Sequence, residues 1–218
     1  MIQVLKETTT KLGNEIQLFG NKNSKPILII GVFHGEEPQG KYLIETYLKS
    51  ISTSPPTSKS KISRKGDMLF IPCLNPDGLQ YGKRTNSNGV DLNRNYPTKN
   101  WEHTEKNEFY GGKSPASEIE TKFVMDIIEE YQPKLILTLH APFKIVNYDG
   151  PAEKIAGEIS KIIGYPLQAS IGYPTPGSFG TYCGVERNIP TITLELDENI
   201  PVQDLIEPVH KIFDMLSE

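Results

Sequence analysis

His34 and Glu37 are the residues whose types and spacing best suit catalytic chemistry, and both lie in the segment Val32–Pro38 (Val-Phe-His-Gly-Glu-Glu-Pro). An imidazole and a carboxylate three residues apart can converge on one point. Catalytic zinc takes three such nitrogen or oxygen ligands together with a water molecule. The pair is equally compatible with a turn histidine followed by a carboxylate that the helix dipole favours in a first helical turn. The segment therefore suggests a metal site but needs a third ligand.

His140 is the candidate for that third ligand. It follows Leu135–Leu139, an apolar run that predicts a buried strand, and His34 follows another such run, Pro26–Val32. Open α/β sheets build their sites at the carboxyl ends of their strands. We therefore expect both imidazoles at the same edge of the sheet, where Glu37 would complete a zinc site with two histidines and one glutamate.

Three more side chains suit the hydrolysis of an amide. Glu195, within Thr191–Leu196, is a candidate for the carboxylate that activates a metal-bound water and later protonates the leaving nitrogen. The alternation of that segment leaves open whether Glu195 faces the site or the solvent. Arg84 and Arg94 lie in a long polar stretch, and arginine binds carboxylates in bidentate geometry. An ordinary surface position is the alternative for each arginine.

The elements that would position these residues alternate between strand and helix along the chain. The fold expected is α/β, with a mixed, largely parallel sheet and helices on both faces. Strands are predicted at Glu15–Phe19, Pro26–Val32, Asp67–Ile71, Leu135–Leu139, Ile145–Tyr148 and Thr191–Leu196. Helices are predicted from Pro38 to near Ile51, after Ser117 as far as Pro133, over Glu153–Ile163, and from Pro201 onward. Ser117 and Glu120 have the spacing of a capping box.

Three polar stretches separate these elements. Residues 52–65 read as a solvated loop, and Tyr173–Gly180, rich in glycine and proline, as a mobile one. The stretch from Pro72 to Pro115 is unusually long for an irregular segment in a compact domain, and such segments are usually functional or disordered. The motifs within it favour a function.

The composition predicts one globular domain over residues 1–218. A net charge of −4 and a pI near 5.7 argue against a general nucleic-acid binder, and no apolar run is long enough to span a membrane. The N-terminus shows no signal peptide, so the expected location is the cytoplasm. We expect Cys73 and Cys183 to be buried or half-buried thiols and His103 and His210 to lie at the surface. The sequence leaves the oligomeric state open.

The order of the motifs resembles that of the zinc metallocarboxypeptidases. The resemblance extends from about Leu28 to Leu196, which is most of the chain. It is carried by His34-x-x-Glu37, Asn75–Gly78 (Asn-Pro-Asp-Gly), Gly89–Asn95 (Gly-Val-Asp-Leu-Asn-Arg-Asn), His140 at a strand end, and Glu195. The Gly-Val-Asp-Leu-Asn-Arg-Asn string is highly specific, whereas His-x-x-Glu alone is not.

This resemblance implies a carboxypeptidase-like fold with one zinc ion per chain. By position, the ligands would be His34, Glu37 and His140. The general base would be Glu195, and the residue that stabilises the oxyanion would be Arg84.

The resemblance also implies how the substrate is held. Asn93 and Arg94 match the grip on a free substrate carboxylate, and Tyr173 lies near the mobile tyrosine of the family. Gly180 lies near the position at which digestive carboxypeptidases specific for basic residues keep an acidic side chain. The glycine argues against simple lysine or arginine selectivity.

Within the family, Asn86–Gly89 and Gly172–Gly180 resemble the corresponding segments of bacterial murein peptide amidases. That likeness implies a small peptide substrate, the murein tripeptide, cleaved at its γ-D-glutamyl–meso-diaminopimelate bond during cell-wall peptide recycling in the cytoplasm. The alternatives are a zinc carboxypeptidase acting on other peptides and a deacylase of N-acyl amino acids. A catalytically inactive peptide-binding protein is a further alternative, but such proteins lose the base or a ligand, and neither is lost here.

Overall fold

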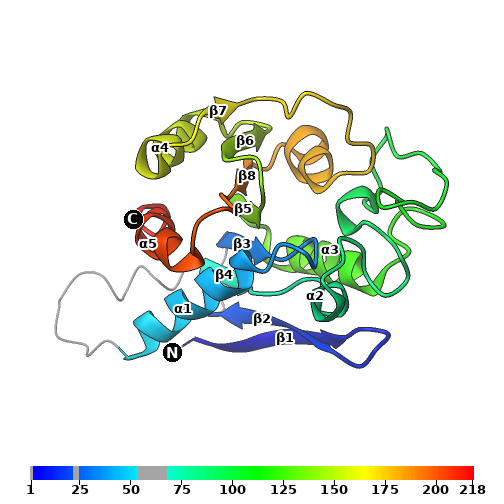
Figure 1. The fold of residues 1–218 in the computed structure, drawn as a ribbon, viewed down its shortest axis with the longest axis horizontal. Coiled ribbons are helices and arrows are strands. Elements are labelled where there is room, and N and C mark those ends of the chain that lie inside the picture. Colours follow the sequence, from blue (N-terminus) through cyan, green and yellow to red (C-terminus); the bar gives the residue numbers. More distant parts are fainter. Residues whose placement is uncertain (1, 22–24, 54–67) are drawn as a thin grey trace.

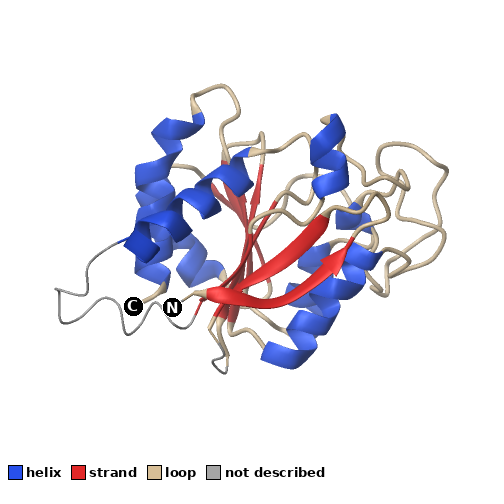
Figure 2. Ribbon diagram, turned by 90° about the horizontal axis from the view of Figure 1, so that it is seen from below, coloured by secondary structure: helices blue, strands red, loops and turns tan. Residues whose placement is uncertain are grey.

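The computed structural model describes residues 2–21, 25–53 and 68–218, which form one eight-stranded mixed sheet with helices on both faces (Figures 1 and 2). The strands are β1 (Gln3–Thr9), β2 (Glu15–Gly20), β3 (Ile27–Gly31), β4 (Met68–Ile71), β5 (Leu135–His140), β6 (Ile145–Asp149), β7 (Leu167–Gln168) and β8 (Thr191–Glu195). The α-helices are α1 (Gln39–Thr53), α2 (Pro76–Tyr81), α3 (Ile119–Tyr131), α4 (Glu153–Ile163) and α5 (Ile206–Leu216). The strand order is β1-β2-β4-β3-β5-β8-β6-β7.

The centre of the sheet is parallel and its flanks are mostly antiparallel. Strand β3 pairs in parallel with β4 and β5, and β5 pairs in parallel with β8. Strands β1 and β2 extend one side antiparallel, and β6 joins the other side antiparallel to β8. All residues of β3, β4 and β5 are buried, which is the pattern of strands covered on both faces. The predicted fold class is confirmed.

Two apolar cores lie on opposite faces of the sheet because strand side chains alternate. Ile27 and Ile29 of β3 pack into one core with α1, α4 and α5. Leu28 and Ile30 pack into the other core, with α3 and the π-helical turn Thr181–Val185. Figure 1 shows the sheet nearly edge-on, with α1, α4 and α5 on one side and α3 on the other.

The chain reverses its direction of travel across the sheet at β3. From β3 it passes through α1 on one face to β4, and from β4 it passes through α3 on the opposite face to β5, on the other side of β3. The connections that leave the carboxyl ends of β3 and β4 therefore lie on opposite faces of the sheet. Open α/β sheets bind ligands in the crevice at such a point.

The predicted strands and helices are found with small shifts, but three elements were missed. Strand β1 lies at the sheet edge with mostly exposed or half-exposed residues, so it has no apolar run to reveal it. Helix α2 begins at Pro76 within Asn-Pro-Asp-Gly, which reads as a turn, and β7 has only two residues. Most of the predicted 52–65 loop and Asp67 lie outside the described residues. No helix in the described part combines the length and apolar character that a membrane span requires.

The predicted capping box is wrong. The N-cap of α3 is Glu118, without a side-chain capping bond, and the Ser117 hydroxyl donates to Oε1 of Glu118 at 2.5 Å. Oε1 of Glu120 accepts a hydrogen bond from Asn86 at 3.2 Å instead of reaching back to the cap. The long segment between β4 and α3 supplies Asn86 and Asn95, whose hydrogen bonds to Glu120 and Glu118 replace the local capping bonds.

The surface prediction holds for His103 but not for His210. Nε2 of His210, half-buried on α5, lies 3.0 Å from the carbonyl oxygen of Leu43, because α5 packs against α1. Cys73 and Cys183 are unpaired thiols, half-buried and buried respectively, as expected.

Candidate metal centre and active site

The parallel register brings two of the predicted residues together. His140 is the last residue of β5 and Glu195 the last residue of β8, and the two are register partners. Ile192 and Leu194 of β8 point into the apolar core, so Thr193 and Glu195 face the opposite side and line a cavity. The facing of Glu195, which the sequence left open, is therefore toward the site.

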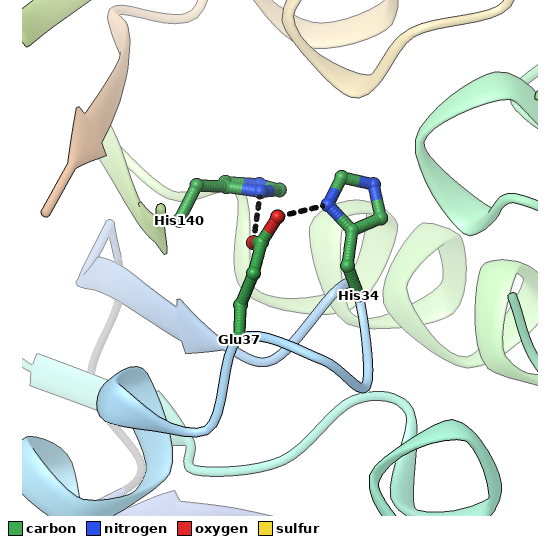
Figure 3. Close-up of side chains that lie close together, drawn as sticks. All are labelled: His34, Glu37 and His140. Carbon is green, nitrogen blue, oxygen red and sulfur yellow. Dashed lines mark hydrogen bonds and ion pairs between the residues drawn. The ribbon is translucent and has the colours of Figure 1, made fainter. Parts of the chain in front are cut away.

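His34, Glu37 and His140 form a buried cluster at the carboxyl ends of β3 and β5. Nδ1 of His34 lies 2.7 Å from Oε1 of Glu37, and Nδ1 of His140 lies 3.0 Å from Oε2 of the same carboxylate (Figure 3). One ligand atom from each residue can be chosen so that all lie within 4.8 Å of one another. Two imidazole nitrogens and a carboxylate oxygen are a donor set that suits catalytic zinc.

Charge pairing dominates the electrostatics of this cluster. Burial by itself would lower the pKa of His34, but the carboxylates of Glu37 and Asp91 raise it to about 9. Burial would likewise raise the pKa of Glu37, but His34 and His140 lower it to about 2. The cluster therefore attracts positive charge, and a metal ion would replace the proton that the imidazole and the carboxylate share.

Asp91 holds the His34 ring in place through its other ring nitrogen, a role that sequence reasoning missed. Its fully buried carboxylate places Oδ1 3.1 Å from Nε2 of His34, while Oδ2 accepts hydrogen bonds from Nε and Nη2 of Arg84 at 3.0 and 2.9 Å. Burial would raise the pKa of Asp91, but His34 and Arg84 hold it well below its usual range. A carboxylate on Nε2 leaves Nδ1 of His34 for a metal. The sequence signal that could have revealed this role is the position of Asp91 inside the Gly89–Asn95 motif.

Asn75 fastens the turn after β3 to the segment that carries Arg84. Its Nδ2 donates to the carbonyl oxygens of Phe33 and Arg84, both at 3.2 Å, and its Oδ1 accepts from the backbone N–H of Gly78 at 2.9 Å. A Cβ atom at Gly35 would collide with the backbone of Gly78, so the two segments pack without room for a side chain. These contacts fix the positions of the His34 imidazole and the Arg84 guanidinium.

Arg84 and Arg94 line the same cavity as the three candidate ligands, which has a volume of about 320 Å³. Arg94 is buried and the Arg84 side chain is 17% exposed, so neither is an ordinary surface arginine. Their guanidinium carbons lie 5.2 Å (Arg84) and 6.0 Å (Arg94) from the ring centroid of Phe109. Two buried or half-buried guanidinium groups on one wall make that wall suitable for an anionic group.

Asn93 and Tyr173 complete this wall. Oδ1 of Asn93 accepts a hydrogen bond from the backbone N–H of Phe179 at 2.9 Å, an orientation that leaves its Nδ2 group as a donor toward the cavity. Tyr173 lines the cavity with 45% of its surface exposed. Burial lowers the pKa of Arg94, and Asp91 and the Tyr173 hydroxyl oppose that shift. The mobility expected for the Tyr173–Gly180 loop stays a prediction.

Glu195 has an oxygen that lacks a protein partner. Its Oε2 is buried, and no residue in the described part of the chain donates a hydrogen bond to it. Burial raises the pKa of Glu195 above its usual range, and Glu37 adds to the shift, while His140 opposes it. A buried acceptor without a partner is costly unless something else donates to it. A metal-bound water would be such a donor.

Comparisons with known proteins agree with this geometry. The family described as "Zinc carboxypeptidase" matches residues 2–158. The chain is 33% identical over 181 residues to murein peptide amidase A of Escherichia coli, covering 77% of this chain and 69% of that protein. It is also 33% identical over 189 residues to murein peptide amidase A of Vibrio campbellii, covering 80% and 70%.

Solved structures share the fold over the whole chain. The crystal structure of a murein-tripeptide amidase from Escherichia coli has a TM-score of 0.82 at 27% identity, covering 100% of this chain and 92% of that one. Thrombin-activatable fibrinolysis inhibitor has a TM-score of 0.79 at 17% identity, covering 100% and 68%, a likeness of fold alone. By its family match, its relatives and its fold, this chain belongs to the zinc carboxypeptidase family and is a hydrolase of the metallopeptidase and amidase type.

Proposed function

We propose that this protein is a zinc-dependent amidase that cleaves the γ-D-glutamyl–meso-diaminopimelate bond of the murein tripeptide in cell-wall peptide recycling. The observation that carries the proposal is a cavity in which a His-Glu-His cluster, a buried glutamate with one unpaired oxygen and an arginine-lined wall meet. Its substrate is suggested by relatives at 33% identity that are named murein peptide amidase A.

One zinc ion per chain would be held by Nδ1 of His34, the Glu37 carboxylate and Nδ1 of His140. When bound, such an ion polarises the scissile carbonyl and lowers the pKa of a water molecule toward about 7. Asp91 keeps the His34 ring in the orientation that presents Nδ1, through the 3.1 Å contact with Nε2.

Glu195 would move the protons of the reaction. Its unpaired Oε2 accepts a proton from the attacking water and then delivers it to the departing amine of diaminopimelate. Burial raises the pKa of this carboxyl above its usual range, which makes it a better acceptor than an exposed glutamate. Arg84, anchored by Asp91, donates hydrogen bonds to the oxyanion, and one such donor is typically worth roughly 3 kcal/mol.

Asn93, Arg94 and Tyr173 would select which amide reaches the reacting centre. The diaminopimelate residue of the tripeptide keeps a free carboxylate beside the scissile nitrogen. Arg94 can bind that carboxylate in bidentate geometry, and Asn93 and Tyr173 supply further hydrogen bonds. This arrangement suits a substrate that ends in a carboxylate immediately after the cleaved bond.

We also propose that residues 1–218 act as a single catalytic domain and that the protein works in the cytoplasm. One sheet contains strands from both the N-terminal and the C-terminal parts of the chain, which supports the first statement. Two unpaired cysteines, Cys73 and Cys183, support the second, because thiols persist in reducing compartments.

Mass spectrometry of the reaction products tests the proposed function. The zinc-loaded protein is incubated separately with L-Ala-γ-D-Glu-meso-diaminopimelate, the same tripeptide ending in lysine, a C-terminal dipeptide and an N-acetyl amino acid. We expect L-Ala-D-Glu and free diaminopimelate from the first substrate at the highest kcat/KM. Faster turnover of the dipeptide or the N-acetyl amino acid would replace the proposal with a general carboxypeptidase or a deacylase. Equal turnover of the two tripeptides would indicate a broader peptidase.

A further inference from the structure

Phe109 borders two cavities at once. Its ring lines the cavity that contains the three candidate ligands, and it also lines a second cavity of about 230 Å³. Arg94 and Tyr173 line both cavities as well. Phe109 is 45% exposed, and single exposed apolar residues are common on protein surfaces. What sets this residue apart is its contact with both arginines of the active-site wall.

One ring lies against two guanidinium groups. The guanidinium carbon of Arg84 is 5.2 Å from the centroid of the Phe109 ring, and that of Arg94 is 6.0 Å from it. Both distances fall within the range of about 6 Å over which the negative face of an aromatic ring attracts a cation. Burial lowers the pKa of Arg94, and repulsion from the Arg84 guanidinium adds to that shift. The ring therefore attracts two groups that repel each other.

The rest of the protein holds the two guanidinium groups with unequal strength. Arg84 is fixed by hydrogen bonds from its Nε and Nη2 to Oδ2 of Asp91, at 3.0 and 2.9 Å. Nη1 of Arg94 donates to the carbonyl oxygen of Asn93 at 2.7 Å, and Tyr173 is a further partner. No carboxylate in the described part of the chain forms an ion pair with Arg94. A long side chain without an ionic partner keeps rotamer freedom unless packing removes it.

The backbone that carries Phe109 is joined to the same aspartate. The N–H of Phe109 donates to Oδ1 of Asn107 at 2.8 Å, and the carbonyl oxygen of Tyr110 accepts from the N–H of Asp91 at 2.9 Å. Asp91 thus locates the ring through its backbone and the Arg84 guanidinium through its side chain. The ring and this anchored guanidinium together form the surface on which the less anchored arginine lies.

We propose that Phe109 is a positioning residue, which holds the Arg94 guanidinium at a fixed separation from that of Arg84. The assignment rests on the proposed function, in which Arg84 faces the developing oxyanion and Arg94 faces the carboxylate beside the scissile nitrogen. In the substrate these two anionic groups are joined through the scissile C–N bond, the N–Cα bond and the bond to the carboxylate carbon. Their separation varies little, so the two guanidinium groups must match it before the carbonyl is correctly placed.

The test compares the murein tripeptide with the same peptide amidated at the carboxylate beside the scissile bond. The ratio of the two kcat/KM values is the carboxylate preference, which reports on Arg94. Phe109→Leu keeps an apolar side chain but removes the ring, and it should reduce the preference by about 3- to 30-fold, the range for a lost cation–π contact from exposed to desolvated. Zinc content and Tm should stay as in the wild type. An equal loss on both substrates, which leaves the preference unchanged, would overturn the assignment.

Two further variants separate the ring from the volume it fills. Phe109→Tyr retains an aromatic face at a half-open position and should keep the carboxylate preference within about 2-fold of the wild type. Phe143→Leu makes the matched change at another exposed phenylalanine of the same cavity, on which no guanidinium of the described residues stacks, and should retain the preference. If Phe109→Tyr loses as much preference as Phe109→Leu, the ring face is not what positions Arg94.

A double-mutant cycle asks whether Phe109 acts through Arg94. In an Arg94→Lys background the planar guanidinium is already gone, so Phe109→Leu should change the carboxylate preference by less than about 2-fold. The loss in the double variant should therefore be close to that of Arg94→Lys alone. Losses that multiply independently would show that the two residues do not act together, and the assignment would fall.

The assignment and the proposed function can fail separately. If the wild type cleaves no murein tripeptide, the proposed function fails, and binding replaces turnover as the readout. Calorimetry of the zinc-loaded protein compares meso-diaminopimelate with its monoamide, neither of which has a peptide bond to cleave. The wild type and Phe109→Tyr should bind the free acid more tightly, and Phe109→Leu should lose about 3- to 30-fold of that difference. No difference between the two ligands in the wild type, or the same difference in Phe109→Leu, overturns the assignment.

Discussion

Oδ1 of Asp91 lies 3.1 Å from Nε2 of His34, and both side chains are buried. The other oxygen of the same carboxylate accepts two hydrogen bonds from Arg84. One aspartate therefore orients an imidazole that faces the candidate metal site and a guanidinium that faces the cavity. We therefore expect any change at Asp91 to affect both the metal affinity of the site, through His34, and the position of Arg84 in the cavity.

Asp91→Asn should weaken zinc binding by about 10–100-fold, the usual effect of losing a carboxylate behind a histidine ligand. An amide has one acceptor oxygen and cannot serve both His34 and Arg84 as the carboxylate does. Titration with zinc against a competing chelator measures the affinity. Asp126→Asn, at an exposed position on α3, is the matched control and should bind zinc as the wild type does. Wild-type affinity in Asp91→Asn would contradict this role.

His140→Ala should lose most of the bound zinc while the chain stays folded. The variant keeps His34 and Glu37 but has two of the three donors that a catalytic zinc site requires. Elemental analysis of the purified protein gives the number of zinc ions per chain, and circular dichroism checks the fold. His103→Ala removes an exposed histidine and should retain about one zinc per chain. Full zinc content in His140→Ala would exclude His140 as a ligand.

Glu195→Gln should keep zinc and substrate affinity but lower kcat by about 10²–10⁴-fold. The amide is nearly isosteric with the carboxylate but cannot accept a proton from water. Glu198→Gln changes an exposed residue three positions further on and should leave kcat unchanged. Steady-state kinetics on the tripeptide separates kcat from KM. A Glu195→Gln variant that retains more than roughly a tenth of the wild-type kcat would remove Glu195 from the mechanism.

Arg94→Lys should lower kcat/KM for the murein tripeptide by roughly 2–4 kcal/mol of transition-state binding. Lysine keeps the charge but cannot form the planar, bidentate pair with a carboxylate. A substrate amidated at the carboxylate beside the scissile bond should be cleaved poorly by the wild type, with a similar loss. The same amidation should cost the Arg94→Lys variant much less. If the two losses simply add, Arg94 and that carboxylate do not interact.

Glu120→Gln should make the protein more stable at alkaline pH. Burial raises the pKa of Glu120 from 4.5 to about 7, so the folded state binds this proton more tightly than the unfolded state does. Stability from this group is full below about pH 4.5 and is lost as the pH rises toward 7. The variant should exceed the wild type by about 1–3 kcal/mol at pH 8. Urea unfolding at pH 5 and pH 8 measures the two differences, and an equal difference at both values would contradict the prediction.

The sequence located the strands that carry the candidate site because those strands are buried on both faces. Buried parallel strands read as continuous apolar runs, so the ends of β3 and β5, and with them His34 and His140, were visible without a structure. The polar edge strand β1 and the short helix α2 were not visible, because neither has an apolar pattern of its own. Local pattern was also misleading at Ser117, where tertiary partners replaced the capping box.

By itself the sequence determined the types of the candidate ligands, the base and the arginines, and the resemblance that assigned their roles. Only the tertiary structure decided that Glu195 faces the cavity, that Asp91 contacts both His34 and Arg84, and that Asp149 occupies the space beside Gly180. Each of these facts depends on which strands and loops lie side by side. Apart from the contact between Arg84 and Asp91, which are seven positions apart, these pairings join residues about 30 to 60 positions apart and leave no periodic trace in the sequence around either partner.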